Sequence, residues 1–92
     1  MLIVVAYDIP NDKQRTRLHK TLKRYGEAVQ YSLFECILAA DQFDEMRREV
    51  AAVLEHEELW RVRYYELCGE CQRGTVTLGK AFTTRLKLVY IV

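Results

Sequence analysis

The chain has 92 residues, of which 50% are apolar and 29% are charged, and its formal net charge is +1. This size and composition predict one globular domain and exclude a disordered segment. No apolar run is long enough to cross a membrane and the N-terminus lacks the regions of a signal peptide, so we expect a cytoplasmic protein without a membrane partner. The three cysteines are then expected to be reduced.

The charges are distributed unevenly along the chain. Residues 13–24 hold six basic side chains and no acid. In residues 41–58 seven acids stand against two arginines, and from residue 61 onwards basic side chains again outnumber acids. A folded chain with one basic face can bind polyanions without an extreme isoelectric point. Solvated helix faces are the alternative explanation of the same charge runs.

The first predicted element is a strand over residues 2–8, because a short aliphatic and β-branched run is typical of a buried central strand. Asp8 stands at its carboxyl end, two residues before Pro10. Strand ends often carry the chemistry of α/β-type sheets, and a carboxylate beside buried aliphatic residues is costly unless it is paired. Asp8 is therefore a candidate functional residue, and capping of the following turn is the alternative.

A helix is predicted next, with Asn11 as its N-cap and Gln14 completing a capping box. Its apolar stripe runs through Leu18, Leu22 and Tyr25. Gly26 is expected as the C′ residue that ends the helix. One turn earlier on the same stripe, Arg15 is expected to point towards the end of the first strand, where it could pair with Asp8 or bind a phosphate.

Residues 27–38 are rich in β-formers but too long for one ordinary strand, so we expect two strands with a break near Tyr31 and Ser32. A second helix follows with Asp41 as its N-cap, and Trp60 is expected to pack as a lid. Residues 61–67 alternate as a half-exposed strand does. The order β, α, β, β, α, β predicts an α+β, ferredoxin-like fold, in which both helices cover one face of an antiparallel sheet.

The C-terminal part adds two segments. Residues 68–80 hold three of the four glycines and are expected to form a loop or ribbon. Residues 85–92 read as an apolar strand, which would be an exposed edge unless a second copy covers it in a two-fold dimer. We therefore expect one domain over residues 1–92, with a core over 1–67 and a C-terminal ribbon and dimer-swapped strand over 68–92.

One aspartate supplies little of the octahedral oxygen ligation that Mg²⁺ requires. In a dimer, however, Asp8 of both copies could hold Mg²⁺, which would polarise a phosphodiester and activate a water. Arg15 and Arg17 are the candidates for neutralising the charge that develops. Tyr7 points to the opposite side of the strand and is expected in the core or an interface.

Cys68 and Cys71 form a C-x-x-C pair. A zinc site needs four ligands, and a redox pair is expected at a helix start that follows a strand. A loop with two small residues is the simplest interpretation, and a structural zinc site is the alternative.

Four features occur together in this sequence: YDI at residues 7–9, a basic helix with Arg15 and Arg17, Gly26 leading into VQYSLFE at residues 29–35, and a terminal strand. In this combination the chain resembles, over essentially its whole length, the second CRISPR-associated protein family, the small protein of spacer acquisition.

The resemblance implies a ferredoxin-like homodimer that binds Mg²⁺ and cleaves phosphodiesters in single-stranded RNA or double-stranded DNA. It also implies a scaffold role in the complex that inserts new spacers, so the expected partners are a second copy, the CRISPR integrase subunit, and DNA or RNA. The residues carried over are Asp8 as catalytic and metal-binding residue, Arg15, Arg17 and Tyr7 as nucleic-acid-binding residues, and Phe34 as a structural residue near the site.

Three classes of function compete for this sequence. They are a metal-dependent endonuclease, a nucleic-acid-binding scaffold without catalysis, and a small-molecule regulatory module of the kind that many ferredoxin-like domains form. The fold alone does not decide between them. The basic first helix and the lack of a glycine-rich turn argue against the third class. We expect a nucleic-acid-binding homodimer that acts with the integrase in spacer acquisition and has endonuclease activity.

Overall fold

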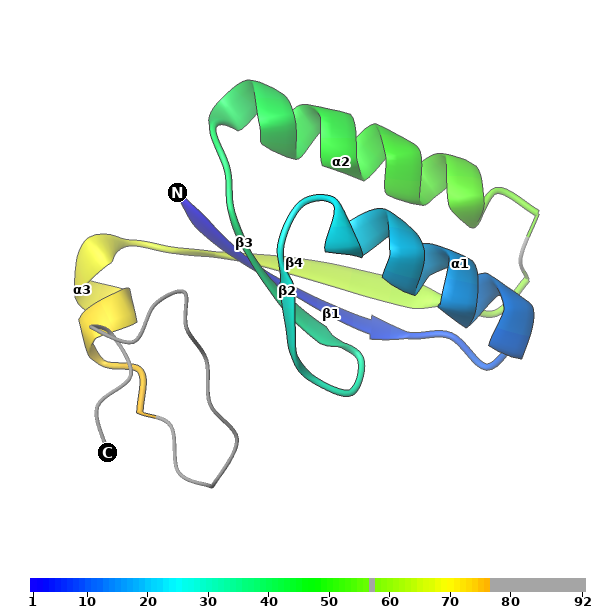
Figure 1. Cartoon of the computed structure of the whole chain (residues 1–92), viewed down its shortest axis with the longest axis horizontal. Coiled ribbons are helices and arrows are strands. Elements are labelled where there is room, and N and C mark those ends of the chain that lie inside the picture. The colour runs from blue at the N-terminus through cyan, green and yellow to red at the C-terminus, as the bar shows by residue number, and fades with distance from the viewer. Residues whose placement is uncertain (57, 77–92) are drawn as a thin grey trace.

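The computed structural model of the chain describes residues 1–56 and 58–76. Its elements are β1 (Leu2–Asp8), α1 (Asp12–Lys23), β2 (Glu27–Gln30), β3 (Leu33–Ile37), α2 (Ala40–Val53), β4 (Arg61–Leu67) and α3 (Gly69–Arg73). The strands form one antiparallel sheet in the order β2, β3, β1, β4, and α1 and α2 lie side by side on one of its faces (Figure 1). The predicted ferredoxin-like fold is confirmed.

The core lies between the sheet and the two long helices. Alternate residues of β1 point into it, so Ile3 and Val5 are fully buried while Asp8 at the end of the strand is exposed. The other buried apolar side chains come mainly from α1, β3 and α2: Leu18, Leu22, Phe34, Cys36, Met46, Val50 and Leu54. Since β1 has a neighbouring strand on each side, its carboxyl end is held firmly in place.

The extended region between the helices breaks where the sequence predicts it. Ser32 adopts a φ of 65°, in the left-handed region that most residues avoid, and so forms the turn between β2 and β3. Its carbonyl oxygen accepts a hydrogen bond from the backbone N–H of Tyr7 at 3.1 Å. This bond ties the turn to the end of β1.

Gly26 has a different role from the predicted one. The C-cap of α1 is Arg24, two residues earlier, and the N–H of Gly26 donates to the carbonyl oxygen of Leu22 at 3.0 Å. A Cβ at Gly26 would lie 2.2 Å from the carbonyl oxygen of Glu35 and 2.5 Å from Sγ of Cys36. Glycine is therefore required here because the chain passes directly against β3, not because it ends the helix.

Two further local predictions are wrong. α2 begins one residue before Asp41, with Ala39 as its N-cap, and the N–H of Ala39 donates to Oε1 of Gln42 at 2.8 Å. Asp41 lies in the first turn instead, where a carboxylate interacts favourably with the positive end of the helix dipole. Trp60 is 42% exposed and does not act as a lid over the core.

The segment after β4 also differs from the prediction. Residues 69–73 form the short helix α3 rather than a loop or ribbon. The predicted C-terminal strand over residues 85–92 lies outside the described residues, so the division of the domain at residue 67 stays a prediction. Within the described ranges, no helix is long and apolar enough to cross a bilayer.

Substituting Gly26 tests the close approach to β3. We expect Gly26→Ala to destabilise the fold by about 1–3 kcal/mol, because the added methyl group overlaps backbone atoms that cannot yield. Chemical denaturation followed by circular dichroism measures this. Gly74→Ala is the matched control, since a Cβ at Gly74 would lie 3.5 Å from the nearest carbonyl oxygen, an ordinary contact. Equal stabilities of the two variants would contradict the explanation.

Candidate functional site

The candidate site is formed by the carboxyl end of β1 and the first residues of β4. The two strands are antiparallel, and their register places Arg61 opposite Asp8 and Arg63 two positions further into the sheet. Val62 and Tyr64, which alternate with these arginines, pack against the core. Because successive side chains of a strand point to opposite faces, Asp8, Arg61 and Arg63 share the face that α1 and α2 leave uncovered.

These side chains line a cleft of about 230 Å³. Its walls are Ala6, Tyr7, Asp8, Arg61 and Arg63, and the carboxylate and both guanidinium groups belong to exposed residues. One acid and two permanent cations therefore meet at an accessible surface. Guanidinium groups match phosphate oxygens in charge and geometry, and a carboxylate is a hard ligand for a divalent cation.

The charged groups of this cleft form no ion pairs with one another among the described residues. Among the residues that the structure describes, the Asp8 carboxylate and the Arg61 guanidinium form no hydrogen bond or ion pair. Arg63 donates through Nη1 to the Tyr65 hydroxyl at 3.4 Å, and this contact raises the pKa of Arg63. The two arginines remain cationic and available to a ligand.

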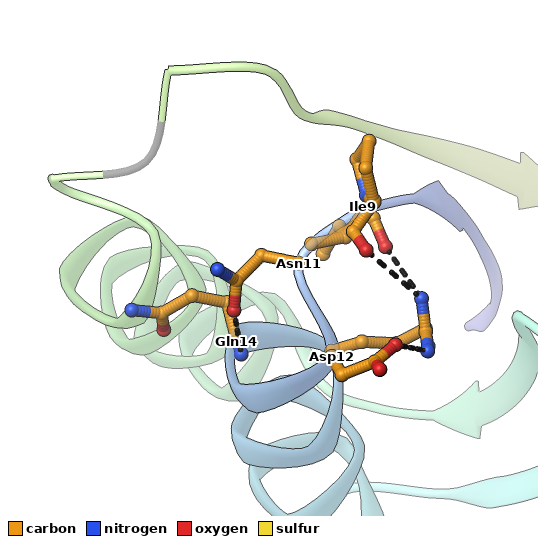
Figure 2. A network of polar contacts seen from close by, with 6 residues as sticks. Ile9, Asn11, Asp12 and Gln14 are labelled. Atoms are coloured by element: carbon orange, nitrogen blue, oxygen red, sulfur yellow. Dashed lines mark hydrogen bonds and ion pairs between the residues drawn. The ribbon is translucent and has the colours of Figure 1, made fainter.

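Arg15 does not pair with Asp8, so that part of the prediction is wrong. Its Nη1 donates to the carbonyl oxygen of Ile9 at 2.9 Å and to that of Pro10 at 3.4 Å, and its Nη2 forms an ion pair with Asp12 (Figure 2). The guanidinium thus bridges the connection from β1 to the first turn of α1. Its position fits a residue that holds this loop in shape.

Arg17 lies on α1, in the helical layer. Its Nη1 is 3.5 Å from Oε1 of Gln14, and the side chain is exposed. The predicted N-cap at Asn11 is confirmed, since its Oδ1 accepts from the N–H of Gln14 at 2.9 Å. Neither Arg15 nor Arg17 is among the described residues that line the Asp8 cleft.

Tyr7 and Phe34 form the apolar support beneath the site. Their ring centroids are 6.3 Å apart, Phe34 is fully buried, and Tyr7 is 8% exposed. Burial raises the pKa of the Tyr7 hydroxyl, with a smaller contribution from Tyr31. Tyr7 also lines a second cleft, of about 240 Å³, whose walls include Arg15 and His19. Phe34 is thus a buried core residue next to Tyr7. Its role in supporting the site and direct binding of nucleic acid by Tyr7 both stay predictions.

Asp8 fits one position of a Mg²⁺ site, because its exposed carboxylate has no competing cation contact among the described residues. Over residues 1–56 and 58–76, no three His, Cys, Asp or Glu side chains are grouped so that they could hold a metal ion. The Asp8 cleft of one copy, as far as the described residues form it, thus offers a single carboxylate to a metal ion. Phosphate oxygens, water or Asp8 of a second copy would have to complete the coordination.

Arg61 and Arg63 were not predicted from the sequence as companions of Asp8. A signal for them was present, because residues 61–67 alternate and the predicted fold places the last strand antiparallel to the first. In that arrangement the start of the last strand lies beside the end of the first, where Asp8 stands. The prediction relied instead on the helical stripe, which turns Arg15 towards the end of the first strand, and on the family resemblance, which supplied Arg15 and Arg17.

The family model described as CRISPR associated protein Cas2 matches residues 1–75. The chain belongs to the Cas2 family. The matched range contains every element from β1 to α3, and with them all residues of the Asp8 cleft.

Similar proteins agree with the Cas2 assignment. The CRISPR-associated endoribonuclease Cas2 3 of Synechocystis is 41% identical over 68 residues, which are 74% of this chain and 73% of that protein. The CRISPR-associated endoribonuclease Cas2 3 of Chloroflexus aurantiacus is 36% identical over 92 residues, which are 100% of this chain and 98% of that protein. The crystal structure of Streptococcus pyogenes Cas2 matches with a TM-score of 0.75 and 28% identity, covering 86% of this chain and 100% of that one.

The contacts of Arg15 generate a testable prediction. We expect Arg15→Gln to lower the free energy of unfolding by about 1 kcal/mol, because two backbone carbonyl groups lose their charged donor. Denaturation in urea measures this effect. Arg17→Gln is the control and should leave stability unchanged, since its contact is long and exposed. The structural role assigned to Arg15 is wrong if both variants are as stable as the wild type.

Proposed function

We propose that this chain is the nuclease subunit of a Cas2 homodimer, which binds RNA or DNA at the cleft of Asp8, Arg61 and Arg63 and cleaves a phosphodiester bond with Mg²⁺. The observation that carries the proposal is the register of β1 and β4, which sets the Asp8 carboxylate, without a partner among the described residues, beside two arginines on one open face. The relatives from Synechocystis and Chloroflexus aurantiacus, both named endoribonucleases, support the nuclease activity.

Each side chain of the cleft has a defined task in this proposal. Arg61 and Arg63 donate to the non-bridging oxygens of the scissile phosphate and stabilise the additional negative charge of the transition state. Asp8 holds the cation. When bound, Mg²⁺ supplies polarisation of the phosphodiester and activation of a water. Tyr7 and Phe34, buried below, keep the end of β1 in position.

We infer that two copies act together, because Asp8 of a second copy would supply a second carboxylate, and Mg²⁺ is commonly bound by one or two carboxylates. The open face of the sheet also carries exposed apolar groups, with Ile37 47% and Tyr65 46% exposed. Burying such side chains against a second copy would stabilise a domain of this small size. Resemblance to the family also supports the CRISPR integrase subunit as the partner and spacer acquisition as the process.

A nucleic-acid-binding scaffold without catalysis is the second candidate. It is favoured by the lack of a three-residue metal-binding group among the described residues. The two candidates share the arginines and differ in their need for Asp8. Experiments on Asp8 and on the arginines can therefore be read separately.

Asp8→Asn tests catalysis, because the amide keeps the shape of the carboxylate and removes its charge. We expect cleavage of RNA or DNA in Mg²⁺ to fall by at least ~100-fold, while affinity for the uncleaved strand changes little. A Mg²⁺ titration of wild type and variant, read on gels, measures the loss. Asp41→Asn, an exposed carboxylate on α2, is the control. Full activity of Asp8→Asn would contradict the role assigned to Asp8, and a wild type that binds but does not cleave would favour the scaffold.

Replacing both arginines of the cleft tests binding. We expect Arg61→Gln/Arg63→Gln to weaken binding of a short oligonucleotide and to reduce the slope of log K against log salt by about 1.5, since each lost phosphate contact removes roughly 0.7–0.9. Fluorescence anisotropy over a range of KCl concentrations gives the slope. Arg48→Gln/Arg73→Gln removes the same charge from other exposed positions. If both double variants change the slope equally, the cleft is not the binding site.

A further inference from the structure

The Cys68 and Cys71 pair lies in a setting that the sequence did not reveal. Cys68 directly follows β4 and is the N-cap of α3, and Cys71 is the middle residue of that five-residue helix. A loop was the expectation for this segment. The structure instead has the strand, helix start and C-x-x-C order that is typical of a redox pair.

The two thiols are close enough to react with each other. Their sulfur atoms are 3.3 Å apart, and both residues are exposed. A disulfide requires a separation of about 2.05 Å, so closure needs a shift of little more than one ångström. The i, i+3 spacing within one helical turn keeps both side chains on the same side of the chain. Neither a large backbone movement nor unfolding is needed.

The two sulfur atoms are not equivalent. The backbone N–H of Cys71 donates to Sγ of Cys68 at 3.4 Å, and this contact, with the neighbouring thiol, lowers the pKa of Cys68. The pKa of Cys71 is raised, first by its side-chain hydrogen bond with Cys68. Of the two thiols, Cys68 therefore has the greater thiolate character, which makes it the better nucleophile.

Metal binding explains the pair less well. Zinc sites in proteins use four ligands, or three and a water. In the part of the chain that the structure describes, no third His, Cys, Asp or Glu joins the two thiols to form such a group. The remaining cysteine, Cys36, is fully buried in the core.

We propose that Cys68 and Cys71 form a redox-active dithiol that closes reversibly to a disulfide by exchange with a low-molecular-weight disulfide such as oxidised glutathione. The Cys68 thiolate attacks one sulfur of glutathione disulfide, forms a mixed disulfide and releases one glutathione thiolate. The Cys71 thiolate then attacks Sγ of Cys68 and releases the second glutathione. Two protein thiols lose two electrons and two protons, and one glutathione disulfide gains them as two thiols.

The nucleic-acid cleft and this pair lie at opposite ends of β4. Arg61 begins the strand, and Leu67 ends it next to Cys68. The side-chain amide of Gln72 in α3 donates to the carbonyl oxygen of Leu67 at 3.1 Å, so α3 is attached to the strand end. The proposed disulfide therefore acts at a site separate from the Asp8 cleft, and its test does not depend on nuclease activity.

The experiment uses the whole chain, which is equilibrated with mixtures of reduced and oxidised glutathione. Its remaining free thiols are then blocked with an alkylating reagent, and the mass of the intact protein is measured by mass spectrometry. We expect wild type to lose two alkylatable thiols together in one reversible transition, while buried Cys36 is alkylated only after denaturation. Cys71→Ser should accumulate a mixed disulfide with one glutathione on Cys68. Cys68→Ser should react more slowly than Cys71→Ser, because Cys71→Ser keeps the backbone N–H at position 71 that donates to Sγ of Cys68 and lowers the pKa of that thiol.

The other outcomes overturn the proposal. Wild type that accumulates a stable glutathione adduct shows that the pair does not close. Equal rates for Cys68→Ser and Cys71→Ser show that Cys68 is not the nucleophile. Both serine variants are at exposed positions, and circular dichroism of each shows whether the fold is retained.

Discussion

The structure depends on the pairing of β1 with β4. This antiparallel ladder aligns seven residues of one strand with seven of the other, from Leu2 opposite Leu67 to Asp8 opposite Arg61. Because side chains alternate between the two faces, a shift of β4 by one residue relative to β1 would turn both arginines towards the core and Val62 and Tyr64 towards solvent. The hydrophobic pattern therefore fixes the register, and the register creates the charged cleft.

The basic residues near the end of β1 divide into two groups with different contacts. The guanidinium of Arg15 donates hydrogen bonds to backbone carbonyl groups and forms an ion pair with Asp12, and so it stabilises the loop that follows the strand. Arg61 and Arg63 project from a strand into the open cleft beside Asp8. A guanidinium held by the protein's own carbonyl groups gains less from a phosphate than one without such partners. These contacts, rather than the density of basic residues, distinguish the arginine that stabilises the loop from the two that line the Asp8 cleft.

The sequence was sufficient to predict the order of the elements, the two-layer fold, the turn at Ser32 and the position of Asp8 at the end of the first strand, since all of these follow from local periodicity and turn chemistry. It was not sufficient for features that depend on distant contacts. Gly26 is required by the approach of β3, and Arg15 is drawn to carbonyl groups of the preceding loop. The arginine pair beside Asp8 arises from the pairing of strands more than fifty residues apart in the chain, and α3 forms where glycines suggested a loop.

The central claim is that Arg61 and Arg63, rather than the arginines of α1, meet the nucleic acid beside Asp8. It is tested most directly by NMR of the arginine Nε–H groups during titration with a short oligonucleotide in the absence of divalent cations. The account predicts that the signals of Arg61 and Arg63 shift together and reach saturation, while that of Arg15 keeps its position. Shifts confined to Arg15 and Arg17, with Arg61 and Arg63 unchanged, would contradict it.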